Sequence, residues 1–176
     1  MMRGRFVKIG DKPVEAVKAR DDVAWALEGD RGVTFAATPP QGSEVVAGEW
    51  WPSDYSGPPL VSMEKEVAEG LGLAVGETVV VNVLGRDVVA RIANFRKVNW
   101  RSFAINFVLV YSPNVFAGAP YSALVSVALP SGDGEENEIA ILRATAHEFP
   151  DVATVRVRPH RSQTNTRSRR CIDPEH

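Results

Sequence analysis

The side chains that most often carry chemistry in proteins are few and scattered in this sequence. Its three histidines are His147, His160 and His176, and no two of them stand at the spacing of a helical metal site. We expect His147 to lie near the end of a helix, where a cation is favoured without any catalytic role. The sequence therefore predicts no metal site.

A serine could act as a nucleophile only beside a base. The G-x-S-x-G pattern of a nucleophile elbow does not occur in the sequence. Ser62, Ser102 or Ser112 would each need His147 as the base, and nothing in the sequence indicates that His147 lies near any of them. We therefore expect a protein that is not an enzyme, and a lipid-active hydrolase with an unrecognised site is the third of three hypotheses.

Gly70, Gly72 and Gly76 superficially resemble the glycine-rich loop of a nucleotide site. Such a loop follows a strand and opens a helix, so that the helix N-terminus faces the phosphates. Here the predicted helix comes before the glycines and a predicted strand follows them. The glycines therefore indicate structural turns, and we expect neither ATP nor any other cofactor to bind this chain.

Composition places the chain among ordinary globular proteins, with 176 residues of which 44% are hydrophobic and 24% charged. Its net charge of −2 gives no reason to expect a nucleic-acid partner. Residues 159–176 are basic and nearly free of apolar side chains, so we expect a disordered tail there. That tail holds the only cysteine, Cys171, which excludes an internal disulfide. No apolar run approaches the roughly 20 residues of a membrane-spanning helix.

Alternating short strands and helices indicate an α+β fold. We expect an outer lobe, about residues 1–48 and 112–158, with a mixed sheet and helices on one face of it. A smaller, β-rich lobe, about residues 49–111, would be inserted between these two segments. The predicted strands cover residues 3–17, 33–37, 78–84, 87–95, 105–111, 122–129 and 152–157, and the predicted helices cover residues 23–28, 62–71 and 135–149.

Two details of this assignment can be checked directly. Ser62 is expected to cap the second helix, in which Met63, Val67 and Leu71 recur at helical spacing. Gly85 is expected to be the first residue of a two-residue type II′ turn that joins the strands of a hairpin. The strand at residues 105–111 is apolar on both faces, so we expect it to be central in its sheet.

Two groups of aromatic residues are candidates for contact with a ligand or partner. Trp50, Trp51 and Tyr55 lie around a proline- and glycine-rich loop, and Phe116 and Tyr121 flank a second apolar loop. If Trp50 and Trp51 lie on a strand, their side chains point to opposite faces and cannot easily share one pocket. Packing between the lobes and an exposed aromatic surface for a lipid-like ligand or a partner remain alternatives.

The segment around these tryptophans resembles a known family. Gly48-Glu49-Trp50-Trp51 is followed by a predicted helix and by Ala68-Glu69-Gly70-Leu71-Gly72-Leu73-Ala74-Val75-Gly76-Glu77-Thr78-Val79. In order and spacing these phrases resemble the large extracytoplasmic domain of FtsX-like and MacB-type ABC transporter permeases. The phrase at residues 98–108 is similar to the YbbP-like branch of these permeases. The resemblance covers residues 3–158.

The resemblance implies a MacB-like periplasmic core domain that is anchored to the plasma membrane by helices outside this sequence. Such a domain works with a cytoplasmic ABC ATPase subunit, whose ATP-driven motion it relays to a substrate or partner protein outside the cytoplasm. The full transporter could form a dimer. The alternative from another functional class is a stand-alone interaction module.

Overall fold

The computed structural model describes residues 1–99, 105–125 and 135–152. The chain divides into two compact units, residues 1–128 and 129–176, which are described separately. The strand expected at residues 152–157 and the tail expected at 159–176 lie almost wholly outside the described residues. Of the strand expected at residues 122–129, only residues 122–125 are described, and they form no strand.

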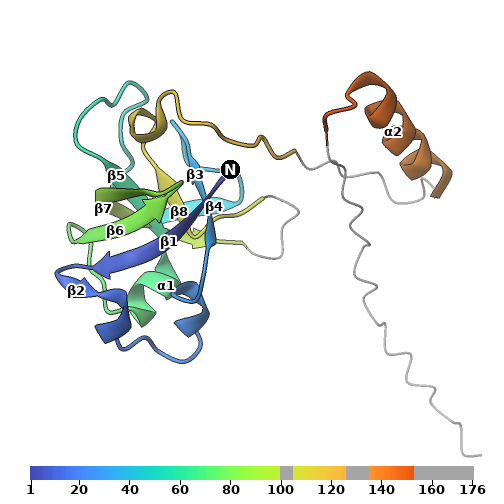
Figure 1. Ribbon diagram of the computed structural model, residues 1–176. Helices are drawn as coiled ribbons and strands as arrows, with labels where there is room; N and C mark the ends of the chain where they lie inside the picture. The colour runs from blue at the N-terminus through green and yellow to red at the C-terminus, as the bar shows by residue number, and fades with distance from the viewer. Residues whose placement is uncertain (100–104, 126–134, 153–176) are drawn as a thin grey trace, which may run out of the picture. The chain divides into compact units, whose positions relative to one another are not determined.

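The first unit is built from eight strands (Figure 1). They are β1 (Met2–Ile9), β2 (Lys12–Pro13), β3 (Arg31–Phe35), β4 (Ser43–Gly48), β5 (Leu60–Glu64), β6 (Thr78–Val83), β7 (Arg86–Val98) and β8 (Leu109–Tyr111). Six of them close into a barrel in the order β1-β3-β8-β5-β7-β6, because β6 pairs with both β7 and β1. The β3–β8 and β5–β7 pairs are parallel, and the other barrel pairs are antiparallel. β4 is added along β7, and β2 along β1.

Alternation of side chains along the strands fills the barrel interior. On β1 the buried positions include Met2, Phe6 and Ile9, and a bulge after Phe6 restores the inward phase for Ile9. On β6 the buried positions are Val79, Val81 and Val83. These residues belong to one hydrophobic cluster with side chains from β3, β5, β7 and β8.

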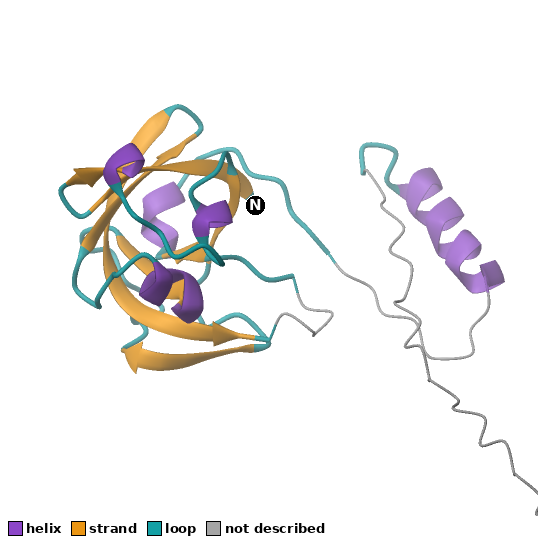
Figure 2. Ribbon diagram, turned by 90° about the horizontal axis from the view of Figure 1, so that it is seen from below, coloured by secondary structure: helices purple, strands orange, loops and turns teal. Residues whose placement is uncertain are grey.

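Short helices lie at one end of this barrel (Figure 2). They are α1 (Lys65–Gly70) and the 3₁₀ turns η1 (Val14–Ala16) and η2 (Ala24–Ala26). The loop before η2 is joined to α1 by a 2.9 Å hydrogen bond from the amide of Arg20 to the carbonyl of Gly70. A fourth helical turn, η3 (Pro113–Phe116), follows β8.

The mixed α+β character is confirmed, but the expected two lobes are not separate in the described residues. β1 and β3 lie in the segment assigned to the outer lobe, whereas β5 to β8 lie in the segment assigned to the inserted lobe. All six strands close the same barrel, because β1 takes β6 and β3 takes β8 as partner. Three of the helical segments of this unit, α1, η1 and η2, also gather at a barrel end instead of covering one face of an open sheet.

Two local predictions need correction. Ser62 and Met63 lie in the fully buried strand β5, and the helix starts later because the Glu64 carboxylate accepts the amide of Val67 at 2.8 Å. The hairpin of β6 and β7 is confirmed, but its turn is Leu84-Gly85. Both turn residues have positive φ, 52° and 82°, which is a type I′ turn.

The central position expected for residues 105–111 is confirmed for residues 109–111 only. β8 pairs with β3 on one side and with β5 on the other. Residues 105–108 precede the strand and form none themselves.

The second unit contains α2 (Glu135–Glu148), as its helical periodicity predicts. Its described apolar side chains include Ile139 and Ile141, which are exposed by 37% and 40%. Within the described ranges, no helix is long and apolar enough to cross a membrane.

Candidate functional site

The path of the chain into the two tryptophans is set by Gly48, the last residue of β4. Its φ is +74°, and a Cβ atom at this position would lie 2.2 Å from the carbonyl oxygen of Ala93. Only glycine fits such a conformation so close to a neighbouring backbone. The chain therefore leaves the ladder at Gly48, and Trp50 and Trp51 are not strand residues.

Because the tryptophans are not on a strand, they share one pocket, contrary to the expectation from strand geometry. Their ring centroids are 4.2 Å apart with planes inclined by 32°. The indole Nε1 of Trp50 donates to the carbonyl of Ala37, and that of Trp51 donates to the carbonyl of Ala36, each at 2.9 Å. Trp51 is buried and Trp50 half-buried, so this pair mainly fixes the loop after β3.

Trp51 is part of a second, smaller apolar cluster. Its buried members are Trp51, Leu60 and Val110, with Tyr55 and Phe107 among the partly buried side chains packed on them. The hydroxyl of Tyr55 donates to the carbonyl of Pro58 at 2.8 Å. Packing therefore explains the position of Trp51 and of the buried part of the Trp50 side chain.

The other two candidate residues lie in a different cluster. Phe116 is buried, with its ring 5.2 Å from that of Tyr111 and 6.2 Å from that of Phe35. Tyr121 is 59% exposed and meets Phe35 edge to face at 5.3 Å. Of the five candidates, only Tyr121 is exposed, whereas Trp50 and Tyr55 are half-buried.

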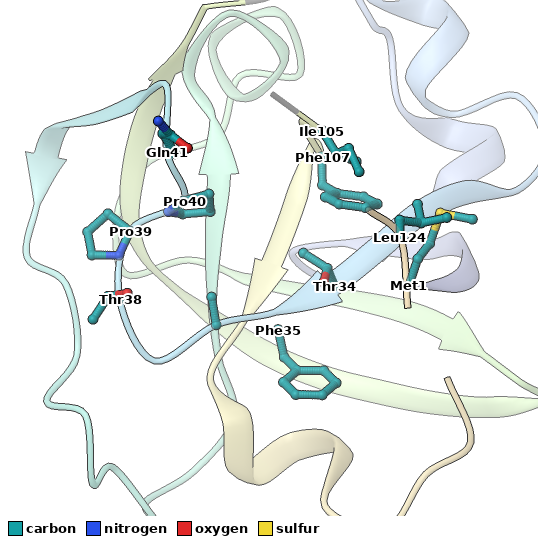
Figure 3. A pocket seen from close by; sticks show the side chains of 11 residues that line it. Met1, Thr34, Phe35, Thr38, Pro39, Pro40, Gln41, Ile105, Phe107 and Leu124 are labelled. Carbon is teal, nitrogen blue, oxygen red and sulfur yellow. The ribbon is translucent and has the colours of Figure 1, made fainter. Parts of the chain in front are cut away.

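A cleft of about 390 Å³ opens over the end of β3 (Figure 3). On one side lie Ile105, Phe107, Leu124 and Met1, and on the other lie Thr38, Pro39, Pro40 and Gln41. Thr34 forms part of the floor, whereas the ring of Phe35 points away from the opening. None of the lining side chains is charged, so they offer apolar and neutral polar contacts.

Phe107, in the wall of the cleft, is hydrogen-bonded to a buried polar network that the sequence analysis did not predict. Arg96 on β7 is only 1% exposed, and its Nε donates to the Oγ of Ser62 on β5 at 2.7 Å. Its Nη2 lies 3.0 Å from the carbonyl oxygen of Phe107, 3.2 Å from that of Val108 and 3.5 Å from that of Ser62. The guanidinium therefore joins β5, β7 and the segment before β8.

The network extends in a second direction. The hydroxyl of Ser62 donates to the Oδ1 of Asn94, and the Nδ2 of Asn94 donates to the carbonyl of Glu49 at 3.0 Å. Glu49 directly precedes the tryptophan pair, so the network reaches the backbone beside Trp50.

Burial lowers the pKa of Arg96 to about 10, and the carboxylate of Glu64 acts in the opposite direction. The guanidinium is therefore still charged at neutral pH.

The phase of β7 is the signal that could have revealed Arg96. Ile92, Asn94, Arg96 and Val98 alternate along the strand, and all four are buried. Two polar residues in phase with two apolar ones indicate a buried polar pair. An isolated arginine in a strand otherwise indicates a solvent-facing position.

The serines considered as nucleophiles have structural partners. Ser62 and Ser112 are fully buried, and the Oγ of Ser112 accepts the amide of Leu60 at 3.3 Å. Ser102 lies outside the described residues. His147 belongs to the second unit, where its Nδ1 is 3.2 Å from a carboxylate oxygen of Glu148. Within the described ranges no group of three or more histidine, cysteine, aspartate or glutamate side chains could hold a metal ion.

Comparison with known proteins points to a transporter. Over 153 residues the chain is 29% identical to the uncharacterised ABC transporter permease YbbP of Escherichia coli strain K12. The match covers 87% of this chain but only 17% of that permease. No protein-family model and no solved structure matches the sequence. The chain is thus related, over most of its length, to a short part of an ABC transporter permease.

Proposed function

We propose that this chain is an extracytoplasmic domain of an ABC transporter permease of the FtsX-like and MacB-like kind. It would dock a substrate or partner protein outside the cytoplasm and relay to it the motion driven by a cytoplasmic ABC ATPase. The observation that carries this proposal is the 29% identity to the E. coli permease over 87% of the chain. The match spans only 17% of that permease, and the proposal assigns the membrane helices and the ATPase contact to other parts of such a protein.

The closed barrel supports a mechanical role. Each of its six strands is hydrogen-bonded on both sides, so the barrel has no free edge at which it could open under load. The interior is filled by large apolar side chains, and close-packed interiors transmit displacement with little compression. A rigid body of this kind moves as a unit when a connected element moves.

The contact surface that we propose includes Tyr121, together with the half-buried Trp50 and Tyr55. Trp51 and Phe116 would contribute by packing, since both are buried. Aromatic side chains that combine exposed area with few rotatable bonds are favoured as contact residues. The proposal includes a lipid-related substrate for the transporter, because no side chain that lines the cleft is charged.

Purification of the full-length protein from native membranes tests the assignment. A tagged permease should retain an ABC ATPase subunit, and ATP hydrolysis should copurify with it. Absence of any ATPase under conditions that keep a known ABC transporter intact would contradict the proposal.

Site-specific photocrosslinking in the same full-length protein tests the contact surface. A photoreactive residue at position 121 should give a crosslinked product with a protein outside the cytoplasm. The same residue in place of Glu69, which is exposed on α1, serves as the matched control and should give none. Equal products from both positions would argue against a specific contact at Tyr121.

A further inference from the structure

We infer that Arg96 is a positioning residue that staples the segment before β8 to the barrel and so sets one wall of the cleft. This inference does not rest on the proposed function, because it concerns only contacts within residues 1–128.

The segment needs such a staple because backbone pairing with β5 reaches only its last residue, Val108. The ladders of β8 with β3 and β5 begin at Leu109. Before that residue, the carbonyls of Phe107 and Val108 accept hydrogen bonds from Nη2 of Arg96 at 3.0 Å and 3.2 Å. The carbonyl of Val108 also accepts the amide of Glu64 at 3.0 Å. Among the described residues, the Arg96 side chain therefore holds the carbonyl of Phe107 and shares that of Val108 with a backbone donor.

The other side of the guanidinium is anchored in the barrel wall. Its Nε donates to Ser62 on β5, and Ser62 in turn is held by Asn94 on β7. Arg96 and Glu64 are Cα partners in the β5–β7 ladder, so the staple spans neighbouring strands. A planar fork with several donors can reach both sides at once, whereas a lysine ammonium at the same place cannot match this geometry.

The stapled segment carries the cleft wall. Phe107 and Ile105 line the cleft opposite the loop of residues 38–41. The ring of Phe107 lies over Gly32, where a Cβ atom would be 3.0 Å from the ring. Because the carbonyl of Phe107 is held by Arg96, the position of its ring over Gly32 follows from the staple.

Hydrogen exchange measured by mass spectrometry on the whole chain tests this inference. The variants are Arg96→Met, Arg96→Lys and Ser62→Ala, and the matched control is Arg91→Met, which changes an exposed arginine of the same strand. In Arg96→Met, peptides covering residues 60–64 and 105–112 should exchange about tenfold faster or more, because charged hydrogen bonds are lost. Peptides from β1 and β6 should exchange as in the unchanged protein, and so should all peptides of the control.

The other variants distinguish the effect of the planar guanidinium group from the effect of its positive charge. Arg96→Lys keeps the charge, and it should accelerate exchange in the same peptides nearly as much as Arg96→Met. Ser62→Ala removes the acceptor of the Nε hydrogen bond and should accelerate exchange in the same peptides by a smaller factor. If Arg96→Met does not fold, the exchange of Ser62→Ala tests the inference in its place. Three results would overturn the inference. The first is exchange in Arg96→Lys as slow as in the unchanged protein. The others are, in Arg96→Met, unchanged exchange at residues 105–112 or equal acceleration in every peptide.

Discussion

The indole rings of Trp50 and Trp51 stack at a centroid distance of 4.2 Å, although the two residues are adjacent in the chain. On a strand they would point to opposite faces. They stack because the chain leaves β4 at Gly48 with a φ of +74°. Each indole N–H then reaches a backbone carbonyl of the loop after β3, at Ala37 and Ala36.

The two tryptophans should contribute unequally to stability. Trp51→Phe removes a hydrogen bond and volume from a position that is 4% exposed, so it should lower the free energy of unfolding by about 2 kcal/mol. Trp50→Phe removes the same kind of hydrogen bond from a half-buried ring and should cost less than about 1 kcal/mol. Denaturant titration of both variants measures the difference, and equal losses would contradict this account of the pair.

Gly48 should be irreplaceable. Gly48→Ala combines a left-handed backbone with a Cβ atom 2.2 Å from a carbonyl oxygen, so it should cost about 3 kcal/mol or more. Gly118 is the matched control, because its φ of +76° is similar and no atom lies within 4 Å of its Cβ position. Gly118→Ala should cost only about 1 kcal/mol, the price of the backbone conformation. Thermal or chemical unfolding that ranks the two variants equally would exclude the proposed clash.

The hydroxyl group of Tyr111 should lower the stability of the folded protein. The side chain is fully buried in the barrel, and its hydroxyl has no hydrogen-bond partner within the described residues. Tyr111→Phe should therefore raise the free energy of unfolding by about 1 kcal/mol. Tyr55→Phe is the control, and it should lower stability, because the Tyr55 hydroxyl donates to Pro58.

The same burial predicts a pH dependence. Burial raises the pKa of Tyr111 above its model-compound value of 10.0. The unfolded chain therefore loses this proton first, so this residue's contribution to stability is complete below about pH 10 and declines above it. Unfolding measured between neutral and alkaline pH should show a smaller alkaline decline in Tyr111→Phe. An identical decline in both proteins would assign it to other groups.

The hairpin tip should be open to improvement. Leu84 is 54% exposed and has a φ of 52°, which is unfavourable for a bulky side chain. Asn-Gly is the preferred sequence of a type I′ turn, so Leu84→Asn should stabilise the protein by about 1 kcal/mol. Leu84→Ala keeps the left-handed cost and should bring no such gain. A Leu84→Asn variant that is less stable than the unchanged protein would contradict the view that the positive φ of Leu84 costs stability.

Local patterns predicted the elements better than their assembly. The hairpin of β6 and β7 follows from alternating valines, and α2 follows from helical spacing and charge placement. Closure of the barrel could not be predicted in this way, because it depends on pairs such as Val33 with Leu109, which no periodicity encodes. The start of α1 was misplaced for a related reason. Ser62 is a good helix cap by type, but β5 is buried between β7 and β8, and this tertiary pairing prevails over local propensity.

Which of the five candidate aromatic residues are exposed could not be predicted from the sequence. Trp51 and Phe116 are buried and Tyr121 is exposed, and this depends on which loops cover them. Arg96 was overlooked, although its phase with Ile92 and Val98 indicated an inward position. A single charged residue seldom occupies such a position without partners, and those partners come from distant parts of the chain.

The side of the membrane on which this domain lies is the central claim, and cysteine labelling measures it most directly. A single cysteine is introduced by Val89→Cys, at a position that is 56% exposed on β7, in an otherwise cysteine-free full-length protein. Intact cells are then treated with a maleimide that cannot cross the cytoplasmic membrane. Our account predicts labelling of this cysteine while a cysteine of a cytoplasmic protein stays unlabelled. Labelling of both only after the cytoplasmic membrane is opened would contradict it.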